Sequence, residues 1–141
     1  MSGSRNAIVK KAKEWLLHAD EDLRLARHAF KLKTSIPYKL IAYHAQQCAE
    51  KCLKAYLVFH DIDFPFTHNI SALVELCLPG KAWVKELEDA RVLSVYAVTA
   101  RYPGAYKVTK KDAVKAVEVA ARVQAVVRKA LKQEGLKTSL S

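Results

Sequence analysis

The chain has 141 residues, which suits one domain with a single sizeable core, and we expect residues 1–141 to form one domain with a core at about 6–133. A hydrophobic fraction of 51% and an aromatic fraction of 9% exclude an intrinsically disordered chain. The net charge is +10, and residues 101–141 carry +7 of it, with ten Lys and Arg against three Asp and Glu. This excess suits nucleic acid, a nucleotide phosphate or an acidic protein partner, although a merely lysine-rich soluble surface has the same composition.

Cysteine content and hydropathy bear on the cellular compartment. Three cysteines are an odd number, and the first residues, MSGSR, lack the apolar segment of a secretory signal. No stretch reaches the roughly 18 apolar residues of a membrane-spanning helix. We therefore expect a reduced, cytoplasmic protein without a membrane partner.

Apolar residues at helical spacing predict two long helices in the first half of the chain. The first covers about residues 6–31, and its acidic residues 20–22 are expected on the outer surface. The second covers about residues 38–59 and begins after Pro37, which suits a first helical turn. The apolar stripe of the first helix recurs at alternating steps of four and three: Ala12, Leu16, Ala19, Leu23, Ala26 and Phe30.

Three further helices are predicted at about residues 70–77, 82–100 and 110–133. Connections of a few to about ten residues favour neighbours that run in opposite directions. The predicted fold class is all-α, an up-and-down antiparallel bundle of four long helices plus one short helix. Residues beyond Gly135 are expected to form a loose tail.

The helix at 82–100 has an alternative, because residues 92–98 are nearly continuously apolar and β-branched. A short buried strand would also fit there. We favour helix, since residues 85–90 are helix-forming and no partner strand is evident. The last helix has a clearer start, because Thr109 and Asp112 resemble a capping box.

The helix at 38–59 divides into two faces at about 100° per residue. One broad arc is apolar and rich in Ala and Cys, so that neighbouring backbones can approach closely. The other arc holds donors, two cations and one carboxylate: His44, Gln47, Lys51 and Lys54, with Gln46 and Glu50 beside them. This helix therefore has a face for packing and a face suited to binding.

Three segments resemble motifs of the HEPN domain family. Residues 46–55, QQCAEKCLKA, resemble the family signature QQAAEKALKA, with Cys at two of the alanine positions. Residues 67–70, THNI, resemble the T-H-D-L segment that follows the second helix of the family. Tyr96 followed by residues 101–103, RYP, resembles the segment YY…RYP. Order and spacing match over about residues 7–131, so the resemblance implies an up-and-down helical bundle.

The resemblance implies several possible functions. HEPN domains include ribonuclease toxins, nucleotide-binding modules and non-catalytic partners of minimal nucleotidyltransferases, and they commonly form homodimers with the functional cleft at or near the interface. The ribonuclease members carry Arg followed, after four to six residues, by His, and this chain lacks that motif. Arg101 is followed at this spacing by Tyr106, and tyrosine, with an ordinary pKa near 10, is a poor general base at neutral pH. We therefore expect a non-catalytic protein without a cofactor.

The candidate site is a basic cleft for nucleotide or RNA phosphate. Ammonium groups supply charge, amides and imidazoles supply directed donors, and an Arg presents a planar pair of donors. Tyrosine rings beside it suit stacking on a base. A histidine just before a helix suits an anion held by the helical amides. The candidates are His44, Gln47, Lys51, Lys54, His68, Arg101 and Tyr102.

Each of these residues also has a structural interpretation. Lys51 and Lys54 would lie on a solvent-exposed face of their helix, where one of them would pair with Glu50 or another acid. Glu50 would form an ion pair with Arg101 across the bundle and orient it. His68 would fix its loop by a local hydrogen bond. His44, Cys48 and Cys52 stand four residues apart, but a closed zinc site needs four ligands, so we expect no metal.

Two rival functions stay open. A divergent ribonuclease toxin would use Arg101, Tyr106 and His68. A structural interaction module would instead present its basic surface to an acidic protein. The leading prediction is a homodimeric HEPN protein that binds nucleotide or RNA phosphate and acts as the partner of a nucleotidyltransferase in a toxin–antitoxin-like pair.

Overall fold

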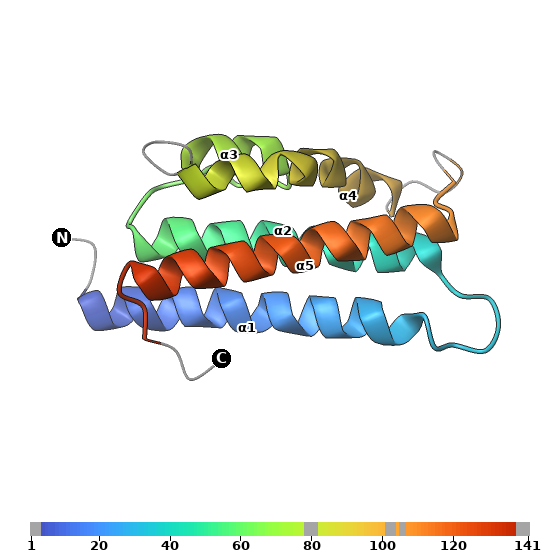
Figure 1. The fold of residues 1–141 in the computed structure, drawn as a ribbon, viewed down its shortest axis with the longest axis horizontal. Coiled ribbons are helices and arrows are strands. Elements are labelled where there is room, and N and C mark those ends of the chain that lie inside the picture. The colour runs from blue at the N-terminus through green and yellow to red at the C-terminus, as the bar shows by residue number, and fades with distance from the viewer. Residues whose placement is uncertain (1–3, 78–81, 101–103, 105–106, 138–141) are drawn as a thin grey trace.

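The computed structural model describes residues 4–77, 82–100, 104 and 107–137, and these residues form helices and loops without a strand. Helices α1, α2 and α5 run along the length of the molecule, and α3, η1 and α4 form a shorter layer above α2 and α5 (Figure 1). The predicted all-α bundle is confirmed, with η1 and α4 together forming its fourth long helix. In chain order the elements are α1 (Arg5–Ala29), α2 (Tyr38–Phe59), α3 (Ile70–Cys77), η1 (Ala82–Ser94), α4 (Val95–Thr99) and α5 (Lys110–Gln133).

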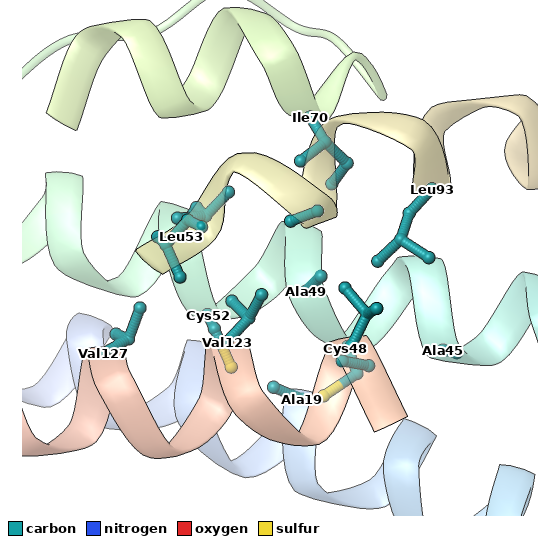
Figure 2. Close-up of a cluster of buried hydrophobic side chains, with 14 of the residues drawn as sticks. Ala19, Ala45, Cys48, Ala49, Cys52, Leu53, Ile70, Leu93, Val123 and Val127 are labelled. Atoms are coloured by element: carbon teal, nitrogen blue, oxygen red, sulfur yellow. The ribbon is translucent and has the colours of Figure 1, made fainter. Parts of the chain in front are cut away.

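Helix α2 is the centre of the fold, because it contacts each of the other five elements. Its Ala and Cys residues allow close packing, and Figure 2 shows Cys48 and Cys52 among side chains that include Ala19 of α1 and Val123 of α5. The sequence predicted one packing face and one polar face. The structure buries most of the polar face as well: Gln46, Gln47, Glu50 and Lys54 are buried, and His44 and Lys51 are half-buried.

The predicted stripe of α1 lies in the core from Ala12 to Ala26, while Phe30 is partly buried. The expectation that the acidic residues 20–22 lie on the outer surface is wrong for two of them. Asp20 accepts hydrogen bonds from Gln124 and Arg128 of α5, and Asp22 is buried against α2. These positions flank the stripe, so the neighbouring helices cover them.

Residues 82–94 form a 3₁₀ helix rather than the predicted α-helix. Four of its residues are in the core at intervals of three: Val84, Leu87, Ala90 and Leu93. A 3₁₀ helix has three residues per turn and brings such residues onto one line, whereas an α-helix would spread them around its axis. The alternative of a strand over residues 92–98 is wrong, since this segment continues into α4.

The ends of α5 follow from local sequence. Thr109 and Asp112 form the predicted capping box, in which each side chain bonds the backbone N–H of the other. Gly135 ends the helix with φ of +112°, and the Leu136 N–H donates to the carbonyl of Leu131 at 2.8 Å. None of the described helices is long and apolar enough to cross a membrane.

Enlarging a small residue of α2 tests its central position. Ala49 is fully buried, so Ala49→Leu forces methyl groups into a packed core and should lower the free energy of unfolding by about 1–3 kcal/mol. Urea unfolding followed by circular dichroism measures this. Ala125→Leu on the exposed side of α5 is the control and should change little. Equal effects of the two substitutions would contradict the central placement of α2.

Candidate functional site

Glu50 lies at the centre of a buried polar network. Its Oε2 accepts a hydrogen bond from Lys54 Nζ at 2.9 Å, and its Oε1 accepts one from Gln46 Nε2 at 3.0 Å. These partners stand one helical turn after and one turn before it. His68 Nδ1 lies 2.9 Å from the same Oε1. The carboxylate therefore ties α2 to the loop that precedes α3.

Lys54 is buried together with its acid. Its side chain is 7% exposed and that of Glu50 is 4% exposed. The ammonium Nζ lies 5.5 Å from the ring centre of Trp15 and 5.7 Å from that of Phe64. Aromatic faces attract a cation, and the carboxylate neutralises it, so the charge of Lys54 is compensated inside the protein.

Burial alone would raise the pKa of Glu50. Hydrogen bonds from Lys54, Gln46 and His68, together with the positive charge of Lys54, outweigh this effect, and the pKa of Glu50 lies below its ordinary value. The group is thus a carboxylate at neutral pH and only accepts hydrogen bonds. His68 must therefore carry its proton on Nδ1, which fixes both its tautomer and its ring orientation.

A second network joins α1 to α2. Asp22 Oδ1 lies 2.9 Å from His44 Nδ1, and Asp22 Oδ2 accepts a hydrogen bond from Lys51 Nζ at 2.6 Å. The side chains of His44 and Lys51 are 28% and 23% exposed. Beside them, Gln47 donates to the Tyr43 hydroxyl at 2.7 Å. A carboxylate of α1 therefore fixes two half-buried donors of α2.

The structure places the described members of the predicted site at two depths. Gln47 and Lys54 are buried, whereas His44, Lys51 and His68 are half-buried at the rim. Arg101, Tyr102 and Tyr106 lie outside the described residues, and so does the predicted ion pair between Glu50 and Arg101.

The cysteines belong to the packing of α2 and α3. Cys48, Cys52 and Cys77 are buried thiols. A hydrogen bond with Cys48 and burial raise the pKa of Cys52 well above its ordinary value, and burial raises the pKa of Cys77 to about 12. Among the described residues, no three His, Cys, Asp or Glu side chains are grouped as they would be around a metal ion.

Sequence reasoning missed Asp22 and Trp15 as members of these networks. Both stand on α1 seven residues apart, so they share a side of the helix next to the apolar stripe. This spacing was a signal that they meet α2. Gln46 was noticed but not assigned to Glu50, although the two stand four residues apart on one helix.

Known proteins are similar to this chain in sequence and in fold. The HEPN domain family matches residues 12–130, which is most of the chain. The chain belongs to the HEPN domain family. A relative of this HEPN chain is "Putative toxin MJ1304" of Methanocaldococcus jannaschii, which is 32% identical over 92% of this chain and 94% of its own length. The crystal structure of TT1696 from Thermus thermophilus is also similar, with 28% identity and a TM-score of 0.69 over 84% of this chain and 97% of that one.

Removing one member of the buried ion pair should show how much the pair contributes to the stability of the fold. Glu50→Gln leaves the Lys54 ammonium buried without a counter-charge and should lower the free energy of unfolding by about 3–5 kcal/mol. Glu50→Gln combined with Lys54→Met removes both charges and should recover most of that loss. Urea unfolding of the two variants measures this.

Asp89→Asn is the matched control, because Asp89 pairs with Arg122 at 2.9 Å on the surface, where the two side chains are 58% and 46% exposed. We expect this variant to lose less than about 1 kcal/mol. A Glu50→Gln variant as stable as this control would refute the buried ion pair.

Acidification should act through the same carboxylate. Because the folded-state pKa of Glu50 lies below the ordinary value of 4.5, its contribution to stability is complete above that pH and is lost as the pH falls through the folded-state pKa. Thermal unfolding between about pH 7 and about pH 3 should show a steeper loss in wild type than in the Glu50→Gln/Lys54→Met variant. Parallel curves would contradict this assignment.

Proposed function

We propose that this HEPN chain is one member of a toxin–antitoxin-like pair, binds nucleotide or RNA phosphate, and acts as the non-catalytic partner of a minimal nucleotidyltransferase. One observation carries the proposal, namely the likeness to a toxin-named relative over almost the full length of both chains. The absence of Arg followed at four to six residues by His supports a non-catalytic role.

The geometry around α2 supports a binding role. His44, Lys51 and His68 stand at the rim, and each is held by a carboxylate, Asp22 or Glu50. Donors that are already oriented lose little conformational freedom when a phosphate binds. In this proposal Gln47 and Lys54 lie beneath the rim and support it, and Arg101 and Tyr102 complete the site.

The second candidate function is a divergent ribonuclease, and one observation favours it. Glu50 holds the Nδ1 side of the half-exposed His68, as a carboxylate holds the histidine in enzymes that use it as an acid or base. Arg101 and Tyr106 would supply the other groups. This candidate predicts metal-independent RNA cleavage that Arg101→Ala abolishes.

Binding titrations of ATP, GTP and a short single-stranded RNA test the proposal. Wild type and Lys51→Ala/Arg101→Ala are compared at about 50 and about 200 mM salt, with a gel of RNA integrity on the same samples. We expect wild type to bind with an affinity that falls as salt rises and to leave the RNA intact. The variant should bind at least tenfold more weakly. Lys10→Ala/Arg122→Ala removes the same charge elsewhere and should bind as wild type does.

The other outcomes separate the candidates. RNA degraded by wild type alone would favour the ribonuclease. An absence of both binding and cleavage would contradict the proposal and leave a protein-interaction module. Sedimentation of the same samples tests the homodimer that the sequence analysis predicts, for which Val92, Val95 and Val98 offer an exposed apolar line along η1 and α4. A nucleotidyltransferase gene beside this one would support the proposed partner.

A further inference from the structure

The positive charge of the molecule is concentrated at one end of the bundle. The end of α1, the start of α2 and the start of α5 lie together there, at the right of Figure 1. Residues 24–40 and 107–115 contain nine cations and one carboxylate, Asp112, which is a net charge of +8 out of +10 for the whole chain. We call these nine cations the basic end: Arg24, Arg27, Lys31, Lys33, Lys39, Lys107, Lys110, Lys111 and Lys115.

The packing of α1 against α5 places residues 24–40 and 107–115 at the same end of the bundle. Asp20 accepts hydrogen bonds from Gln124 and Arg128, which fixes the register of these antiparallel helices. Beyond this point α1 continues toward Lys31 while α5 runs back toward Lys110. Over about 10 to 14 residues each helix covers about 15 to 21 Å, so the cations from both helices share one end.

These cations are available to a ligand. Eight of them are exposed and Lys39 is partly exposed. In the part of the chain that the structure describes, none of the nine forms an ion pair. By contrast, Lys51, Lys54, Arg91 and Arg122 are each paired with a carboxylate. Asp112, the one acid at this end, is engaged in the capping box.

We infer that the basic end binds the phosphodiester backbone of a nucleic acid. This inference deepens the proposed function, on which it rests for the kind of ligand, and it places the main electrostatic contact away from the rim of α2. At that rim, Asp22 and Glu50 offset the charges of Lys51 and Lys54, so the described residues there carry no net charge. Long-range attraction of a polyanion must therefore come from elsewhere, and the unpaired cations supply it.

The composition of the basic end favours a nucleic acid over an acidic protein. Seven of the nine cations are lysines, which protein interfaces disfavour and which suit phosphates as mobile point charges. Leu25, Leu32, Leu40 and Val114 are also exposed in these two segments, but exposed apolar residues are common on protein surfaces.

A pair of matched variants tests the inference. The end variant carries Lys31→Gln, Lys33→Gln, Lys110→Gln and Lys111→Gln. The control variant carries Lys10→Gln, Lys11→Gln, Lys132→Gln and Lys137→Gln at exposed positions of the opposite end. Both lower the net charge from +10 to +6. One of the control lysines, Lys11, stands among acids, since it lines pockets with Glu14, Asp61 and Asp63.

Fluorescence anisotropy with a labelled, unstructured RNA of about 20 nucleotides measures affinity over a series of salt concentrations. Each phosphate contact on a single strand contributes about 0.7 to the slope of log Kd against log salt. We expect the end variant to lose about 2 to 3 units of slope and at least tenfold in affinity at low salt. The control variant should keep the wild-type slope and lose less than about threefold.

Three results would overturn the inference: equal losses in both variants, wild-type binding by the end variant, or equally tight binding of polyglutamate of the same charge. A DNA strand of the same sequence should lose affinity in parallel with RNA, and the ratio of the wild-type affinities tells which strand the protein prefers. If Lys51→Ala/Arg101→Ala loses binding while the end variant does not, the proposed function stands and this inference fails.

Discussion

The buried ion pair between Glu50 and Lys54 is the interaction on which the rest of the structure depends. It lies on the helix that every other element contacts, and it sits beneath the loop that leads into α3. A charge in this position is tolerated only with a partner of opposite sign and hydrogen bonds to the remaining lone pairs. Gln46 and His68 provide those bonds. The burial of the ion pair on α2 and the position of His68 therefore depend on each other.

This arrangement separates two groups of cations. The lysines of α2 are held by Asp22 and Glu50 and contribute to the packing of α1, α2 and the loop before α3. The cations at the end of α1 and the start of α5 remain unpaired among the described residues and face solvent. In the sequence, most of the excess positive charge lies in the last third of the chain. The fold instead joins residues 24–40 and 107–115 into one basic surface.

The fold was predictable because its signals are local. The alternating steps of four and three in α1, the Ala and Cys of α2 and the capping box at Thr109 each act within one helix. The 3₁₀ helix was missed although Val84, Leu87, Ala90 and Leu93 recur at intervals of three, since α-helix is far the commoner state. The hydrogen-bond networks of the site were harder to predict from the sequence, because Asp22 meets His44 and Lys51 only through tertiary packing.

A lysine-reactivity footprint, read by mass spectrometry with and without bound RNA, tests this division of the cations most directly. We predict that Lys54 resists acetylation in the free protein, that Lys31 and Lys110 react readily, and that RNA protects these two but leaves Lys10 unchanged. Ready acetylation of Lys54 in the folded free protein, or protection confined to Lys51, would contradict it.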